Sequence, residues 1–379
     1  MEKNENIHAE KPKRRIGLYI LYGALTLFVL GIVLSLGDIE EIFSTLKTVN
    51  VNYVLLAVLA LLAYMAIYPL SLCILTKARG CKIKMLRTYN IGMTEHFFNG
   101  ITPMQTGGQP FQAYSYSRSG VKVSESTSLL LMNFLIFMTT TNIYIFCSLF
   151  YFTRFVSSVG MGIIAAIGLT ANFLVLVITF LLGKSKKVCA LLSRFLDFLC
   201  KFGWIAKFLK PKSDSLKNYF VQVQDAFAHL SKKKGAFLLA LMTKIVAMGA
   251  YYSTTFFILR GFGVNIGWGE MFVAILSTCF AITMVAFIPT PGTSGGIEFA
   301  FKAVFAAVAM GTVTNSVATG GMLIWRMLTY YLVMLISLMF YIILEAVFSR
   351  EEKKKRLAEA SLSESESPTE PSDDANGQG

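Results

Sequence analysis

Residues 288–301, IPTPGTSGGIEFAF, place two prolines, three glycines and a glutamate inside an otherwise apolar part of the chain. The protein has 379 residues, of which 55 % are hydrophobic and 15 % charged, a composition typical of integral membrane proteins. Within a bilayer, irregular backbone is tolerated only where it is buried in protein or lines a water-filled cavity. The stretch therefore predicts a broken helix at a functional site inside a membrane protein.

A second copy of this pattern lies 188 residues earlier in the chain. Residues 102–111, TPMQTGGQPF, align without a gap with residues 290–299, TPGTSGGIEF, and share the Thr-Pro pair, the paired glycines and a phenylalanine. When the apolar runs of the first half are shifted by the same 188 residues, two of them align with apolar runs of the second half. The aligned runs are predicted to cross the membrane in opposite directions. We therefore expect the halves at about 53–152 and 236–347 to form an inverted repeat, with broken helices meeting near the midplane as in secondary transporters.

Several apolar runs are long enough to cross about 30 Å of hydrocarbon, which takes about 20 helical residues. They are 16–36, 53–76, 127–152, 159–183, 236–259 and 319–347. The segments beside the first motif, 91–101 and 110–122, are too short and predict a re-entrant hairpin. Beside the second motif, 270–289 could span alone and 297–312 is marginal, so two spans and a hairpin both remain open. We expect an all-α polytopic integral membrane protein with about six to eight transmembrane helices and two re-entrant or broken-helix motifs.

Positive charge is concentrated on one predicted side of the membrane. The net charge is +13, and the loop at 184–235 carries twelve Lys and Arg against three acids. The positive-inside rule places this loop, the N-terminal segment 1–15 and the C terminus in the cytoplasm. The charge thus reflects topology and gives no reason to expect a nucleic-acid partner. The transmembrane domain is expected at 16–348, followed by an acidic, Ser-rich tail at 359–379 that is expected to be disordered.

Apolar residues recur at helical spacing within the basic loop, around Leu191 and Phe195 and again around Phe220 and Val223. Such helices could lie on the inner leaflet or pack on the bundle as a solvated elbow, and the pattern leaves both open. The three histidines lack metal-ligand spacing, and the six cysteines form no CxxC pair, so free thiols and no metal site are expected. No GxxxxGK[ST] phosphate loop is present, which argues against direct use of ATP. We expect no cofactor and no catalytic residue.

The two motifs predict anion-binding helix ends. Pro103 and Pro291 remove backbone donors and end the first half-helices, while the paired glycines allow close approach. The half-helices that follow would offer free N–H groups and a positive dipole end, which attract anions such as phosphate. Ordinary loops between helices are the alternative.

Charged residues within apolar segments usually mark functional paths. Glu298 is the strongest candidate because it is fixed to the second motif, and Lys302, four residues on, could pair with it. Arg326 could serve the site or snorkel outward, whereas Lys244 is expected to snorkel to the cytoplasm. Arg118 could be a positive-inside residue or contact a headgroup. The candidate substrate-binding residues are Thr102, Pro103, Gly107, Gly108, Gln109, Pro110, Arg118, Pro291, Gly292, Gly295, Gly296, Glu298, Lys302 and Arg326.

FNGITPMQTGGQPFQAYSYSRSGVKVSES and IPTPGTSGGIEFAF resemble the two signature regions of the lysylphosphatidylglycerol synthase transmembrane-region family, the flippase-like domain of the multiple peptide resistance factor. The resemblance covers about residues 10–348. The matching positions are Pro103, Gly107, Gly108, Pro110, Pro289, Pro291, Gly292, Gly295 and Glu298. Gln109, which is acidic in some branches, and Gln112, which is often basic, depart from the pattern, so the preferred headgroup charge could differ.

The resemblance implies handling of anionic or aminoacylated glycerophospholipids, or other lipid-linked headgroups, in a bacterial plasma membrane. The leading hypothesis is a gradient-driven lipid translocase whose partners are membrane phospholipids. A phosphatidylglycerol lysyltransferase pathway role, linked to resistance against cationic antimicrobial peptides, is the second. It does not make this chain alone an enzyme, because the full-length synthases carry a soluble aminoacyl-transfer domain that we do not find. A regulatory membrane protein is the third hypothesis, and a homo-oligomer or a lipid-modifying enzyme partner is left open.

Overall fold

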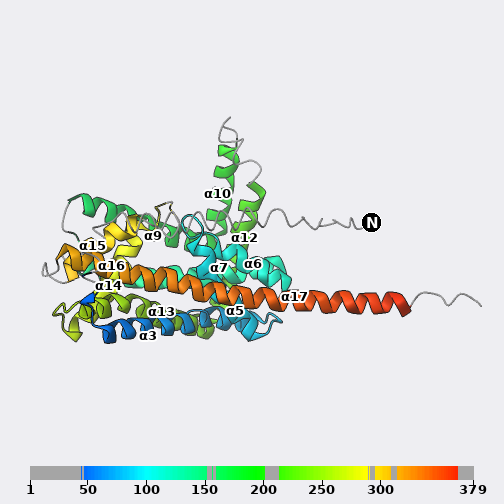
Figure 1. Ribbon diagram of the computed structural model, residues 1–379. Coiled ribbons are helices and arrows are strands. Elements are labelled where there is room, and N and C mark those ends of the chain that lie inside the picture. Colours follow the sequence, from blue (N-terminus) through cyan, green and yellow to red (C-terminus); the bar gives the residue numbers. More distant parts are fainter. Residues whose placement is uncertain are drawn as a thin grey trace, which may run out of the picture.

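The computed structural model describes residues 44, 47–151, 156, 159–200, 213–288, 290, 295–308 and 314–365. All regular elements within these ranges are helices, which confirms the all-α prediction. They are α3 (Val51–Ile67), α4 (Leu70–Arg79), α5 (Met85–Gly100), α6 (Gly108–Arg118), α7 (Val123–Leu149), α9 (Val159–Lys184), α10 (Lys186–Leu199), α12 (Ser213–Lys232), α13 (Lys234–Gly261), η2 (Trp268–Glu270), α14 (Met271–Val285), α15 (Gly296–Val308), α16 (Asn315–Arg326), the π-helix η3 (Met327–Leu332) and α17 (Val333–Ser365). Figure 1 shows most of them running side by side in one bundle.

Six helical stretches of the described chain are long and apolar enough to cross a membrane. They are Val51–Arg79, Val123–Leu149, Gly160–Lys184, Lys234–Gly261, Trp268–Val285 and Ser316–Ala358. Five of them coincide with predicted spans, and the sixth corresponds to the segment 270–289 that could span alone. The predicted span at 16–36 lies outside the described residues. A multi-pass membrane protein therefore follows from both the sequence and the structure.

The helices α3 and α4 form one span that is interrupted at Pro69, and α13 lies antiparallel to it. The start of α3 meets the end of α13, where the Asn50 amide donates to the Gly261 carbonyl at 2.7 Å. These antiparallel helices define the two ends of the bundle. At one end α3 begins and α13 ends, and at the other end α4 ends. The broken motifs can be placed relative to these two ends.

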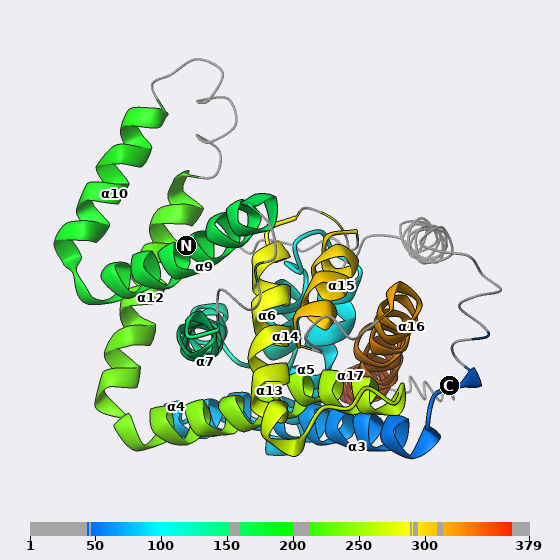
Figure 2. The same cartoon turned by 90° about the vertical axis from the view of Figure 1, so that its left-hand side faces the viewer.

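The first motif forms a helical hairpin that enters from the end where α4 finishes. Its arms are α5 and α6, and its tip contains Met104 and Gln105, both with left-handed backbone at φ 53° and 55°. α14 begins at the opposite end, after α13, and the second motif joins it to α15 (Figures 1 and 2). The 13 described residues of α15 reach about 20 Å, less than the hydrocarbon thickness of a bilayer. The two broken motifs therefore approach the middle of the bundle from opposite ends.

One long helical rod made of α16, η3 and α17 runs along both hairpins. Arg87 pairs with Glu351, and Arg118 donates to both oxygens of Glu345 at 2.9 Å, so α17 is fastened to the first hairpin. The rod continues to Ser365 and projects beyond the bundle (Figure 1). Residues 359–365 are thus helical in the structure, although we expected the tail to be disordered from 359, and the residues after 365 lie outside the described chain.

The basic loop contains two helices that behave differently. α12 packs on the bundle through buried Val223, and its Asp225 accepts hydrogen bonds from Arg79 at 2.6 Å and Ser128 at 2.7 Å. Partial burial raises the pKa of Asp225, but these two hydrogen bonds, together with the nearby charges of Arg79 and His229, outweigh it and hold the pKa below its usual value. α10 runs across the direction of α17 and away from the bundle (Figures 1 and 2). The elbow alternative therefore describes α12, and α10 remains a candidate for lipid contact.

The outer face of α10 is expected to lie in the membrane surface. Leu191, Phe195 and Phe198 are more than half exposed at spacings of four and three, and exposed Arg194 lies beside them. A Phe195→Trp variant should be strongly quenched by brominated lipids in nanodiscs that contain phosphatidylglycerol. An Ala190→Trp variant, on another exposed face of the same helix, should be quenched less. Equal quenching at both positions would contradict this orientation.

Candidate functional site

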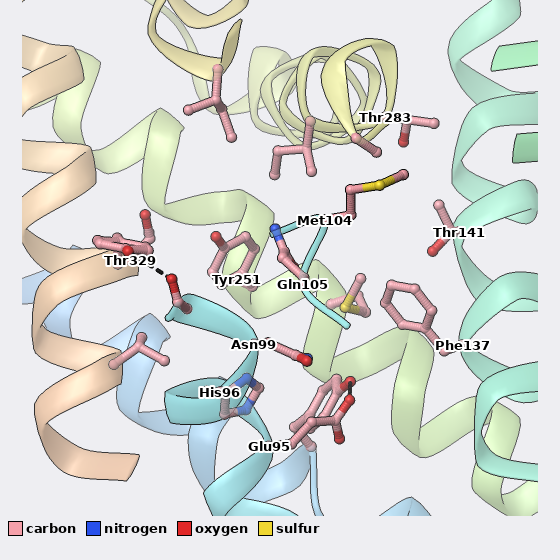
Figure 3. Close-up of a pocket in the computed structure, with 18 of the residues that line it drawn as sticks. Glu95, His96, Asn99, Met104, Gln105, Phe137, Thr141, Tyr251, Thr283 and Thr329 are labelled. Atoms are coloured by element: carbon pink, nitrogen blue, oxygen red, sulfur yellow. Dashed lines mark hydrogen bonds between the residues drawn. The ribbon is translucent and has the colours of Figure 1, made fainter. Parts of the chain in front are cut away.

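A cavity of about 450 Å³ lies where the tip of the first hairpin meets the rod and α13 (Figure 3). The hairpin lines it with Met104, Gln105 and Thr106, followed by Gln109 at the start of α6. Ile297 lines it from the first turn of α15, so both broken motifs reach the same cavity. The volume lies within the range of about 300–1,000 Å³ that small-molecule sites occupy. The cavity is therefore the site to which both motifs contribute.

Sequence chemistry explains why the hairpin turns where it does. α5 ends at Gly100, and Pro103 cannot donate a backbone hydrogen bond. The Thr102 hydroxyl accepts from the Gly107 amide at 2.8 Å, and the Asn99 side-chain oxygen accepts from the Gly108 amide at 2.8 Å. These side chains cap α6 in the way that short polar residues cap helix starts.

The helix starts are therefore not free to bind an anion through these amides, contrary to our expectation. Thr102 and Asn99 already accept from the first amides of α6. At α15 the Glu298 carboxylate accepts from the Gly295 amide at 2.5 Å. The protein supplies its own acceptors at the amides of Gly107, Gly108 and Gly295, a capping that was not foreseen from the sequence.

Glu298 forms a buried ion pair with Arg326, the last residue of α16. The Arg326 Nε donates to Glu298 Oε1 at 2.7 Å, and the side chains are only 5 % and 2 % exposed. Arg326 lines the cavity and does not snorkel outward. The partner expected for Glu298 was Lys302, whose side chain lies outside the described part. The pair ties the second motif to the rod at the point where the π-helix begins.

The cavity wall formed by α5 and the Tyr64–Tyr68 segment is acidic and aromatic. The Tyr68 hydroxyl donates to Glu95 Oε1 at 3.3 Å, and Gln112 Nε2 donates to Glu95 Oε2 at 3.2 Å. His96 packs against both Tyr64 and Tyr68, with ring centroids 5.4 and 4.8 Å away. Its Nε2 is buried and has no hydrogen-bond partner among the described residues. A carboxylate surrounded by ring faces suits a cation better than an anion.

The structure places the predicted site residues differently with respect to the cavity. Gln109 and Arg326 line the cavity. Thr102, Pro103, Gly107, Gly108 and Pro110 form the turn and the first turn of α6 beside it, and Gly295, Gly296 and Glu298 flank or support Ile297 at the start of α15. Arg118 lies on the face of α6 that meets α17, where it pairs with Glu345 and Glu352, so the structure does not place it at the cavity. Pro289, Pro291 and Gly292 lie outside the described residues.

Glu95, His96 and the tyrosines of this wall are not among the residues predicted from the sequence. Lys244 was expected to snorkel, which is wrong: Lys244 is 0 % exposed, and its Nζ lies 3.3 Å from the centroid of the Tyr68 ring. The available signal was a lysine two turns inside an apolar helix, a placement that marks a functional path more often than chance.

Comparison with known proteins agrees with this architecture. The family model described as "Lysylphosphatidylglycerol synthase TM region" matches residues 17–337. A UPF0104 membrane protein of Archaeoglobus fulgidus is 24 % identical over 322 residues, which cover 81 % of this chain and 91 % of that protein. The residues matched by the family model include both hairpins, the rod through Ser337 and the residues that line the cavity. The chain therefore belongs to the lysylphosphatidylglycerol synthase transmembrane-region family.

Proposed function

We propose that this protein binds the headgroup of a membrane phospholipid in the cavity and moves the lipid between the two leaflets. The observation that carries the proposal is the cavity itself, to which two broken-helix motifs contribute from opposite ends of the bundle. Alternating access around a midplane site between inverted repeats is the mechanism that such an arrangement supports. Exchange between leaflets requires a binding site that can open toward either side of the membrane, and a site bounded by motifs from both ends of the bundle meets this requirement.

The chemistry of the cavity favours an aminoacylated headgroup over a purely anionic one. Glu95 and the faces of Tyr64, Tyr68 and Tyr251 form its aromatic side, and this combination stabilises an ammonium group. Arg326 is neutralised by Glu298, while the polar side chain of Gln109 remains for the phosphate or glycerol oxygens. The family description, which names a lysylated lipid, supports the same class.

The energy source is proposed to be a gradient or lipid asymmetry, since the sequence carries no phosphate loop. A second role is compatible with the family description: the protein could serve a lysyl-phosphatidylglycerol pathway by moving the lipid that a separate enzyme makes. In that case the chain itself performs no aminoacyl transfer, and its partner is the lipid-modifying enzyme.

Reconstitution in liposomes tests the proposal. In vesicles that contain the protein, lysyl-phosphatidylglycerol or phosphatidylglycerol placed in one leaflet should distribute over both leaflets faster than in protein-free vesicles. A membrane-impermeant amine reagent follows lysyl-phosphatidylglycerol, and a headgroup label follows phosphatidylglycerol. A Gln109→Trp variant should slow exchange by about tenfold or more, since the indole fills the cavity beside the hairpin tip. A Gln222→Trp variant, which places the same indole on α12, should match the wild type. Exchange equal to that of empty vesicles for every lipid would rule out translocation.

A further inference from the structure

Lys244 is a buried cation without a nearby carboxylate. It lies on α13 within a candidate membrane span and is 0 % exposed. Its Nζ donates to the Tyr68 carbonyl at 3.4 Å and lies 3.3 Å from the centroid of the Tyr68 ring. Among the described residues, no carboxylate oxygen lies within 4.0 Å of it. Burial of an isolated ammonium is costly, so its charge must be balanced from further away or given up.

Tyr68 connects this lysine to the cavity. Its ring and carbonyl hold Lys244 on one side, and its hydroxyl donates to Glu95 on the other at 3.3 Å. Glu95 lines the cavity, whereas Lys244 does not. The lysine therefore acts on the cavity through one tyrosine and one carboxylate.

The other titratable groups of this region are few. Tyr64 faces the site from α3, His96 from α5 and Tyr251 from α13, and Arg326 of α16 is already paired with Glu298. The neighbouring side chains of α6 and α7 are neutral amides, Gln112 and Asn133. Glu95 and Lys244 are thus the only described carboxylate and amine at this wall that are not held in an ion pair of their own.

We propose that Lys244 and Glu95 form a proton-exchange unit that couples the charge of the bound headgroup to the release of a proton. With the cavity empty, the Lys244 ammonium balances the Glu95 carboxylate. When the ammonium of a headgroup takes that role, one N–H bond of the Lys244 ammonium breaks, the nitrogen keeps the electron pair, and the proton leaves through the cavity to water. The net charge of the buried region is the same before and after.

This inference rests on the proposed function, and it names both the charge of the headgroup and the coupling ion. Exchange of one ammonium headgroup for one proton would let a proton gradient drive lipid asymmetry. A gradient of one pH unit is a tenfold ratio of proton activity across the membrane. With one proton exchanged per lipid, it would support up to about a tenfold ratio of lipid concentration between the leaflets.

Proton release on binding is the decisive measurement. The full-length protein in detergent is titrated with short-chain alanyl-phosphatidylglycerol, which has one ammonium group, in two buffers of different ionisation enthalpy. At a pH where Lys244 is charged, the wild type should release about one proton per lipid bound. Short-chain phosphatidylglycerol, which has no ammonium group, should release none.

Variants separate coupling from folding. Lys244→Met removes the exchangeable proton and should bind without proton release, and Lys244→Arg, which keeps its charge, should likewise release none. Lys234→Met, at the exposed start of the same helix, should behave as the wild type. Binding by the wild type without proton release would overturn the exchange unit and leave the proposed function standing. If neither lipid binds, the proposed function and the exchange unit are both overturned.

Discussion

Replacing Arg326 with Met is expected to destabilise the folded protein by about 3–5 kcal/mol, the cost of leaving a buried charge without its partner. The Arg326 side chain is 5 % exposed and contacts Glu298 at 2.7 Å, and that carboxylate also accepts from the Gly295 amide. Loss of the guanidinium would leave the carboxylate to its single amide donor in an apolar region. Denaturant unfolding in detergent measures the change.

A double-mutant cycle shows whether the effect comes from the pair. Glu298→Gln together with Arg326→Met should be markedly more stable than Arg326→Met alone, because no uncompensated charge remains. Arg350→Met, at an exposed position of α17, is the control and should change stability by less than about 0.5 kcal/mol. If the single and double variants are equally unstable, the ion pair does not hold the second motif to the rod.

Substitution of alanine for Gly107 is expected to cost about 1–3 kcal/mol and to displace the tip of the first hairpin. A Cβ atom at this position would lie 2.6 Å from Thr102 Cγ2 and 2.7 Å from the Phe98 carbonyl oxygen. The carbonyl belongs to the backbone of α5 and cannot move aside without bending the hairpin. Because the tip carries Met104 and Gln105 into the cavity, headgroup binding should weaken along with stability.

The matched control is Gly235→Ala. Gly235 is helical, and a Cβ atom there would meet nothing within 4 Å. Alanine at such a site should be neutral or stabilising by about 0.5–1 kcal/mol. Thermal unfolding and lipid titration of both variants give the comparison. Equal behaviour of Gly107→Ala and Gly235→Ala would show that α5 and α6 do not need this close approach.

The membrane fold could be predicted because length and hydropathy almost determine it. A run such as 236–259 has few alternatives to a spanning helix, and α13 occupies it with two residues more at each end. The motifs were also recognisable, since proline and paired glycine break a helix whatever surrounds them. The repeat at 102–111 and 290–299 then indicated that the two breaks belong together.

The contacts of the site could not be predicted in the same way. Glu298 and Arg326 are 28 positions apart, and only the return of α15 against α16 brings them within hydrogen-bond distance. The capping of α6 by Asn99 depends on the angle at which α5 meets α6. Lys244 was placed at the membrane surface because snorkelling is the common fate of a lysine near a helix end, and here the ring and carbonyl of Tyr68 cover it instead.

The π-helix at Met327–Leu332 sets the rotational phase of the long rod. A π-turn holds one residue more than an α-turn, so everything after it is rotated by about 100° relative to an uninterrupted helix. Before the bulge, Arg326 points to the second motif; after it, Ser337 accepts from the Phe97 amide and donates to the Met93 carbonyl of the first hairpin. One helix can therefore serve two hairpins that arrive from opposite ends. Deletion of a single residue from the bulge would put the two halves of the rod out of phase, although every side chain that contacts a hairpin would still be present.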